Sequence, residues 1–281
     1  MTIAVTGASG QLGHLVIEQL MSRAPRETIV ALARSPQKVA DFRVEVRKFD
    51  YSKPDGLAAA LTGVETLLLI SSSEVGKRSM QHQNVIDAAV EAGVARIVYT
   101  SILRADTTDN PLAEEHKTTE AAIQASGIPF TILRNGWYCE NYESAVAASL
   151  EHGTVIGSAR DGRISAAARI DYAEAAAIVV TQSGRENKIH ELAGDTSFSM
   201  YDFAEELSRQ SGRTIPYTDL PEADYAEALL DAGLPEPFAR LLARTDVTAA
   251  GGSLFDDTRQ LSALIGRPTT PISKTIESRL A

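Results

Sequence analysis

The chain has 281 residues, of which 44% are hydrophobic and 23% charged, a composition that excludes collagen-like, disordered and disulfide-rich classes. Its formal net charge of −10 argues against general binding to nucleic acid, because a phosphate backbone is held by a basic surface. The single cysteine permits no internal disulfide, and no apolar run approaches membrane-spanning length. The N-terminus opens on a strand-like segment. Together these features predict a cytoplasmic protein without a membrane partner.

Short apolar segments alternate with helical patterns over the first half of the chain. The expected strands are rich in Val, Ile and Leu and mostly continuous, as strands buried on both faces are. They cover Thr2–Thr6, Thr28–Ala33, Val44–Lys48, Thr66–Ser71, Arg96–Ser101 and Phe130–Arg134. The helices expected between them cover Gln11–Ser22, Pro54–Leu61, Met80–Ala92 and Pro111–Ala125, the last capped by Asn110. The alternation predicts an α/β fold with a doubly wound parallel Rossmann sheet.

The pattern loosens after about residue 150. A strand is expected at Ile189–Ala193, a helix at Met200–Gln210 and a further short strand at Ile215–Leu220, followed mainly by short helices. We therefore expect a Rossmann domain over residues 1–150 and a smaller, mostly helical lobe on the substrate side over residues 151–281, interleaved with it. Phe238 and Phe255 of this lobe are expected in its core.

A glycine-rich turn with the spacing G-x-x-G-x-x-G follows the first strand. It consists of Gly7, Ala8, Ser9, Gly10, Gln11, Leu12 and Gly13. Gly7 can make the tight turn, Gly10 can let the backbone approach a pyrophosphate, and Gly13 can let the helix lie close to the sheet. The new helix presents free N–H groups and its positive end to the phosphates. In this strand–turn–helix context, the turn predicts a dinucleotide-binding site.

The end of the second strand indicates which dinucleotide is preferred. It carries Arg34 and Lys38 but no acidic residue that could bind a ribose hydroxyl. A guanidinium binds phosphate bidentately and an ammonium adds a second charge. The sequence therefore favours NADP(H), with its 2′-phosphate, over NAD, although two solvated surface cations are the simpler alternative.

Polar residues follow the third and fourth strands. Asp50 and Tyr51 stand where an adenine edge could be bound, and Ser71, Ser72 and Ser73 stand near the expected nicotinamide ribose. Polar residues also begin ordinary loops, so position rather than residue type supports these assignments.

A Rossmann fold that opens with Thr-Gly-x-x-Gly-x-x-Gly resembles the short-chain dehydrogenase/reductase superfamily. Its usual members carry Ser after the fifth strand and Tyr-x-x-x-Lys on the next helix. Here the fifth strand ends in Thr100-Ser101, but His116 stands at the tyrosine position and Glu120 at the lysine position. The ordinary tyrosine acid is absent.

Three further groups of motifs are more specific. They are the run from Leu67 to Gly76, the stretch from Leu133 to Tyr142, and the C-terminal segments ELAGD, GGSLFDD and LIGRPTT. With the glycine turn, they resemble the NmrA-like atypical branch of that superfamily, and most of all its bacterial NAD(P)H:quinone oxidoreductases. The resemblance covers essentially the whole chain. It implies NADPH-dependent two-electron reduction of quinones by direct hydride transfer, with neither flavin nor metal.

The resemblance also implies site residues. The contacts named above would bind NADP(H), and the segment Tyr138, Cys139, Glu140 and Asn141 would border the nicotinamide. His116 would contact the ribose or nicotinamide and is a weak catalytic candidate. Trp137, Tyr138 and Arg169 are weak candidates for the substrate cleft. Each has a simpler interpretation: Cys139 as a small buried hydrophobe, Trp137 and Tyr138 as core, and His116 with Glu120 as a hydrogen-bonded structural pair rather than a metal site.

The missing acid is consistent with quinone chemistry. Reducing an unactivated ketone creates an alkoxide whose conjugate acid has a pKa of roughly 16. Hydride addition to a quinone creates a phenolate-like anion of pKa roughly 10, a difference of about 8 kcal/mol. The same absence also fits an NADP(H)-sensing binding protein of the NmrA-like type without turnover, or a reductase of another activated acceptor such as an enone. The sequence leaves open whether the chain forms a homo-oligomer.

Overall fold

The computed structural model describes residues 1–281, which form two compact units. Unit 1 contains residues 1–106, 114–135 and 169–191, and unit 2 contains residues 107–113, 136–168 and 192–281. The chain therefore passes between the units several times, and residues 169–191 of the expected second lobe belong to unit 1. None of the helices has both the length and the apolar character needed to cross a membrane.

Unit 1 is built on a seven-stranded sheet. Its strands are β1 (Thr2–Val5), β2 (Thr28–Ala33), β3 (Glu45–Lys48), β4 (Thr66–Leu69), β5 (Arg96–Ile102), β6 (Phe130–Asn135) and β8 (Lys188–Leu192). They lie in the order β3-β2-β1-β4-β5-β6-β8, and the pairs from β3 to β6 are parallel. This is the Rossmann order, so the predicted fold class is confirmed. Every expected strand lies within two residues of its observed bounds.

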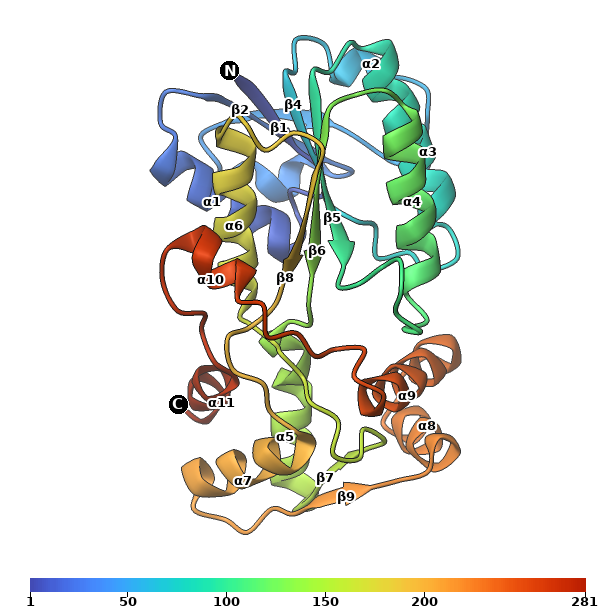
Figure 1. The fold of residues 1–281 in the computed structure, drawn as a ribbon, viewed down its shortest axis with the longest axis vertical. Helices are drawn as coiled ribbons and strands as arrows, with labels where there is room; N and C mark the ends of the chain where they lie inside the picture. Colours follow the sequence, from blue (N-terminus) through green and yellow to red (C-terminus); the bar gives the residue numbers. More distant parts are fainter. The chain divides into compact units, whose positions relative to one another are not determined.

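Helices cover both faces of this sheet (Figure 1). They are α1 (Gln11–Arg23), α2 (Leu57–Ala60), α3 (Arg78–Glu91), α4 (Ala113–Ala125) and α6 (Arg169–Thr181), with the short 3-10 helix η1 (Pro36–Val39). α1 and α6 lie together on one face, and α3 and α4 lie on the other. The expected start of α4 at Pro111 is wrong. The Asn110 side chain accepts a hydrogen bond from Leu112 N–H and the Asn110 carbonyl accepts one from Ala113 N–H, which folds a turn before the helix.

The core of unit 1 follows from the continuous apolar strands. Val30, Leu32, Leu67 and Ile97 are fully buried, and α3 and α4 add further buried side chains to the same cluster. Burying one such aliphatic side chain stabilises the fold by roughly 1.5–3 kcal/mol, and a parallel sheet covered on both faces buries many. The carboxyl ends of its strands meet at one edge of the sheet, where the loops that carry the predicted site begin.

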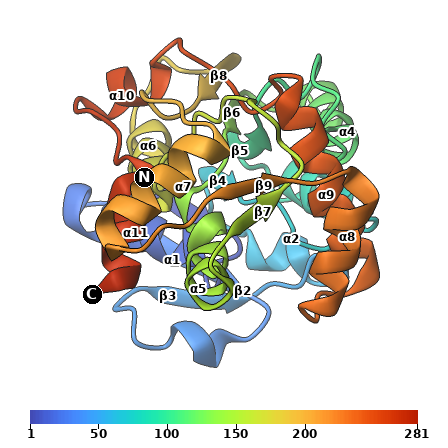
Figure 2. The same ribbon diagram turned by 90° about the horizontal axis from the view of Figure 1, so that it is seen from below.

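Unit 2 is mostly helical. It contains η2 (Cys139–Tyr142), α5 (Glu143–His152), α7 (Met200–Ser211), α8 (Glu222–Asp231), α9 (Glu236–Ala250), α10 (Gln260–Ile265) and α11 (Ile272–Leu280), with the strands β7 (Val155–Gly157) and β9 (Tyr217–Asp219). Figures 1 and 2 both show β7 beside β9, with which it pairs in parallel, and α8 beside α9. Three aromatic rings, those of Tyr142, Phe198 and Phe203, pack together in its core. The expectation of a buried Phe238 is wrong, since its side chain is 49% exposed on α9.

Candidate NAD(P)H-binding site

The glycine turn after β1 leaves the start of α1 open. Gly7 has a φ of +59°, in the left-handed region that suits glycine. A Cβ on Gly13 would lie 2.3 Å from the Gly7 carbonyl oxygen, so the helix approaches the turn as closely as only glycine allows. Gly10 caps α1 without a side-chain hydrogen bond, and the first turn carries no acidic residue. Free N–H groups at a helix start bind anions, so these residues fit a pyrophosphate.

The turn is braced from both sides by hydrogen bonds that sequence analysis did not predict. The Tyr51 hydroxyl donates to the Ile70 carbonyl at 2.8 Å and also bonds Thr6 Oγ1. Thr6 Oγ1 in turn accepts from the Ile70 N–H at 2.9 Å. Tyr51 therefore holds the ends of β1 and β4 together, while Asp50 caps its own loop through Ser52 N–H. The adenine contacts of Asp50 and Tyr51 stay predictions.

The two predicted phosphate-binding cations lie at the end of β2. Arg34 directly follows the strand, and Lys38 lies exposed on η1. The side chain of Arg34 is 64% exposed and forms an ion pair with Glu74, with 2.7 Å between Nη1 and Oε1. Because β2 and β4 flank β1, this pair joins the loops on either side of the glycine turn. Glu74 was not predicted from the sequence, because its pair with Arg34 depends on the sheet order rather than on local spacing.

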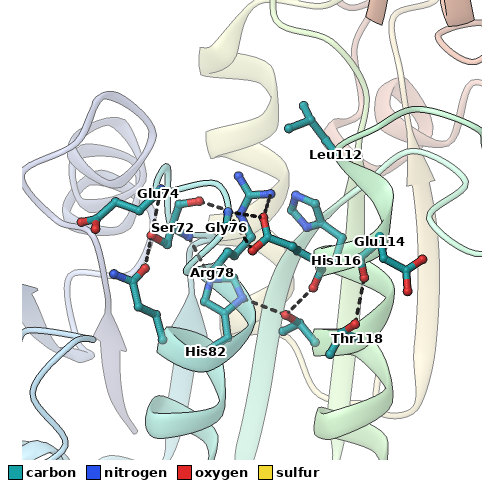
Figure 3. A network of polar contacts seen from close by, with 12 residues as sticks. Ser72, Glu74, Gly76, Arg78, His82, Leu112, Glu114, His116 and Thr118 are labelled. Carbon is teal, nitrogen blue, oxygen red and sulfur yellow. Dashed lines mark hydrogen bonds and ion pairs between the residues drawn. The ribbon is translucent and has the colours of Figure 1, made fainter. Parts of the chain in front are cut away.

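The loop after β4, which contains Ser71–Ser73, is held along its backbone (Figure 3). The Ser71 N–H donates to Thr100 Oγ1 at 3.0 Å, and the Ser72 N–H donates to His82 Nε2 at 2.9 Å. Arg78 Nε donates to the Ser72 carbonyl at 2.7 Å. The first turns of α3 therefore set the course of this loop. Its contact with the nicotinamide ribose stays a prediction.

A buried ion cluster occupies the positions at which the superfamily carries its serine and lysine. Ser101 Oγ donates to Glu120 Oε1 at 2.6 Å, and Arg134 binds both oxygens of Glu120 at 3.0 and 2.7 Å. Arg134 also pairs with Glu191 and Asp106, each at 2.8 Å. Burial opposes the charge of Arg134, but its bonds to Glu120 and Glu191 outweigh that effect and raise its pKa. Ser101 and Glu120 thus serve the fold.

His116 does not pair with Glu120, so that expectation is wrong. The His116 Nδ1 atom lies 2.7 Å from the hydroxyl of Tyr99 on β5, and Glu120 is held by Ser101 and Arg134 instead. Residues four apart share a helix face, but each of these two finds a stronger partner on the sheet. No group of three or more His, Cys, Asp or Glu that could hold a metal ion is present.

The remaining predicted residues are divided between the units. In unit 2, Trp137 packs on the core and Tyr138 forms an isolated bridge with Ala167. Cys139 is fully buried in the same core, and its thiol donates to the Thr270 carbonyl at 3.9 Å. Glu140 and Asn141 lie on η2. Arg169 is the first residue of α6 in unit 1. The cofactor and substrate contacts of these residues stay predictions.

Comparison with known proteins gives consistent results. Residues 7–183 match the sequence profile of a family described as NAD(P)H-binding. Quinone oxidoreductase 2 of Escherichia coli is 52% identical over 98% of this chain and 97% of its own length. The crystal structure of the NADPH-dependent E. coli quinone oxidoreductase with NADPH matches with a TM-score of 0.97 and covers 99% of this chain and 100% of that one.

Other relatives are more distant. A Citrobacter triphenylmethane reductase complexed with NADP(H) matches with a TM-score of 0.94 at 37% identity, covering 99% of this chain and 100% of that one. An NmrA-like oxidoreductase of Aspergillus flavus is 28% identical over 96% of this chain and 92% of its own length. These matches show that the chain belongs to the NAD(P)H-binding family and has NmrA-like homologues, as the sequence motifs predict.

Proposed function

We propose that this chain is an NADPH-dependent quinone reductase that transfers hydride directly, without flavin. The observation that carries the proposal is its 52% identity with a quinone oxidoreductase over 98% of this chain and 97% of the relative. Such similarity over the whole length favours a shared reaction as well as a shared fold. Hydride transfer to a quinone is a two-electron reduction and yields a hydroquinone anion that takes its proton from solvent.

Unit 1 supplies groups that suit NADPH. The N–H groups at the start of α1 would hold the pyrophosphate, and Arg34 with Lys38 would hold the 2′-phosphate. Arg34 already binds an anionic carboxylate from Glu74, so a phosphate would replace one anion by another. Bound NADPH supplies the hydride, while the chain's own residues bind and orient it. Further proposed contacts are Asp50, Tyr51, Ser71–Ser73, His116 and Tyr138–Asn141.

The buried ion cluster explains which acceptors suit the chain. An alcohol dehydrogenase of this superfamily protonates its alkoxide with a tyrosine, but here His116 stands at that position, and Ser101 is bonded to Glu120, which binds Arg134. A quinone relaxes that need, because its reduced anion requires about 8 kcal/mol less stabilisation than an alkoxide. The absence of a free acid–base pair therefore favours an activated acceptor.

The same observation favours a second candidate. A chain whose superfamily serine position is committed to an ion cluster could bind NADP(H) without turnover and report the cofactor's redox state to a protein partner. This candidate predicts binding of NADPH and NADP⁺ with different affinities and no quinone reduction.

One pair of measurements separates the two candidates. Purified protein, shown by its absorption spectrum to carry no flavin, is mixed with NADPH and a simple benzoquinone or naphthoquinone, and the oxidation of NADPH is followed. The quinone reductase predicts turnover well above the uncatalysed rate. A titration with NADPH and NADP⁺ runs beside it. Saturable binding without turnover would reject the enzyme and support the sensor.

A further inference from the structure

A buried tyrosine on β5 of unit 1 lies between two buried histidines. The Tyr99 ring centroid lies 5.5 Å from that of His82 on α3 and 5.9 Å from that of His116 on α4. Tyr99 and His82 are fully buried, and His116 is 5% exposed. Burial of three polar rings requires their polar atoms to be hydrogen-bonded, so the direction of each hydrogen bond can be followed.

Both ring nitrogens of His82 are occupied, and their roles are fixed. The Ser72 backbone N–H donates to Nε2, so Nε2 carries no proton. Nδ1 must then carry the proton of the neutral ring and donate to Thr119 Oγ1, at 2.9 Å. The Thr119 hydroxyl in turn donates a hydrogen bond to the Glu115 carbonyl at 2.8 Å. His82 therefore has a structural role: it holds the backbone of the loop after β4 at Ser72, as Figure 3 shows.

His116 has the opposite arrangement. The Tyr99 hydroxyl is fully buried and has His116 Nδ1 as its hydrogen-bond partner, at 2.7 Å. The only hydrogen bond that the Tyr99 hydroxyl makes is the one to His116 Nδ1, so that nitrogen is the acceptor within hydrogen-bond distance of its proton. The Tyr99 O–H therefore donates to Nδ1, and the proton of the neutral His116 ring must sit on Nε2. No protein group bonds Nε2, and that atom is not sealed from solvent.

His116 stays neutral in this environment. Burial, followed by the positive charge of Arg78, holds the pKa of His116 well below its usual value. Burial also raises the pKa of the Tyr99 hydroxyl, so Tyr99 does not supply a proton to the ring. A neutral imidazole with a proton on Nε2 can donate a hydrogen bond but is not a general acid near neutral pH.

We propose that Tyr99 is a positioning residue that fixes His116 as an Nε2–H hydrogen-bond donor for an oxygen of the bound ligands. The inference rests on the proposed function, because it takes the ligands to be NADPH and a quinone. The oxygen acceptor belongs either to the nicotinamide half of the cofactor or to the quinone carbonyl on which negative charge develops. A preorganised neutral donor stabilises such an oxygen without any proton transfer.

The direct test reads the proton positions without turnover. Nitrogen-15 NMR of the histidine side chains separates the two neutral tautomers and the imidazolium, and His116→Gln and His82→Gln assign the signals. In the full chain at pH 7, we expect His116 with its proton on Nε2 and His82 with its proton on Nδ1. Tyr99→Phe should convert His116 to a mixture of tautomers. A protonated Nδ1 or an imidazolium at His116 in the unaltered chain would overturn the proposal, even if quinone reduction is found.

Two amide substitutions test the donor itself. His116→Gln places an amide N–H near the position of Nε2, and His116→Asn places one near Nδ1. We expect His116→Asn to reduce either the NADPH affinity or the rate of quinone reduction about tenfold, the scale of one hydrogen bond. His116→Gln should stay within about threefold of the unaltered chain in both quantities. Equal losses in both variants, or none in either, would reject the donor role.

Which of the two quantities falls, the NADPH affinity or the rate of quinone reduction, identifies the oxygen acceptor. A weaker dissociation constant for NADPH measured without quinone places the acceptor on the cofactor. An unchanged dissociation constant with a lower rate of quinone reduction places it on the quinone. Circular dichroism of each variant checks the fold.

Discussion

Two arginines at the carboxyl-end edge of the unit 1 sheet, Arg34 and Arg134, differ in their exposure and in the number of carboxylates that they bind. Arg34 follows β2 with 64% of its side chain exposed and binds a single carboxylate, that of Glu74. Arg134, the last but one residue of β6, has 6% of its side chain exposed and binds the carboxylates of Glu120, Glu191 and Asp106. An exposed pair contributes little to stability and can exchange its anion, whereas a buried cluster is saturated and cannot. Burial thus decides which cation is available to a ligand.

The largest expected effect is the loss of the buried cation. Arg134→Met should lower the free energy of unfolding by about 3–5 kcal/mol, because the carboxylate of Glu120 is left buried without a counterion. Urea unfolding at pH 7 measures this change. Arg163→Met removes an exposed pair with Asp202 and is the matched control, with an expected loss below about 1 kcal/mol. Similar losses in the two variants would contradict the contrast between buried and exposed pairs.

A half-buried carboxylate without a cation, that of Asp246, tests the same contrast with the opposite sign. Burial raises the pKa of Asp246 on α9 from 3.8 to about 6, against a hydrogen bond from Ser158 N–H. Because the folded pKa is raised, the stabilising contribution is fully present below pH 4 and is lost as the pH rises through 6. Asp246→Asn should therefore stabilise the protein at pH 8 by up to about 3 kcal/mol and flatten the dependence between pH 4 and 6.

Urea unfolding across this pH range measures the Asp246 effect. Asp231→Asn, at the exposed end of α8, is the control and should leave the free energy of unfolding at pH 8 within about 0.5 kcal/mol of the unaltered chain. A destabilised Asp246→Asn variant at pH 8 would show that the ionised carboxylate is favourable where it lies.

The exposed arginine should affect binding rather than stability. Arg34→Ala should weaken NADPH by roughly 10–100-fold and NADH by less than threefold, since a charge-assisted hydrogen bond to the 2′-phosphate contributes about 1.5–3 kcal/mol. Fluorescence titration with each dinucleotide measures the two constants. Arg26→Ala removes an exposed arginine before the amino end of β2 and is the control. Equal weakening of NADPH and NADH by Arg34→Ala would refute the 2′-phosphate assignment.

The smallest expected effect concerns the carboxylate that now binds Arg34. Glu74→Gln should tighten NADPH about two- to fivefold, because the phosphate no longer competes with a charged partner for the guanidinium, and such an exposed pair is worth below about 1 kcal/mol. NADH affinity should stay unchanged. The control is Glu91→Gln at the exposed end of α3. Weaker NADPH binding by Glu74→Gln would mean that Glu74 helps to hold Arg34 in place.

The fold was largely predictable because its signals are local. Continuous runs such as Thr28–Ala33 mark buried parallel strands, and the glycine turn from Gly7 to Gly13 is contiguous. The three-residue strand β7 was missed because a segment that short has no periodicity to detect. Tertiary partners were also missed. The Arg34–Glu74 pair needs the sheet order, and the Tyr99–His116 bond needs the placement of α4 beside β5.

The site was therefore predicted as positions rather than as interactions. His116 was identified from its alignment with a catalytic tyrosine, but its expected partner was the neighbour four residues along the helix. Arg134 was expected only as a strand residue. It binds the carboxylate of Glu120, which therefore does not pair with His116. Spacing along one helix cannot show which side chains a neighbouring strand presents.

A single-turnover reaction tests the central claim most directly. Flavin-free protein loaded with one equivalent of NADPH is mixed rapidly with excess quinone, and the nicotinamide absorbance is followed. Direct hydride transfer predicts a first-order loss of the full NADPH signal, faster than that of free NADPH with the same quinone, and one equivalent of hydroquinone. NADPH that stays bound and reduced, or reacts only after flavin is added, would contradict the account.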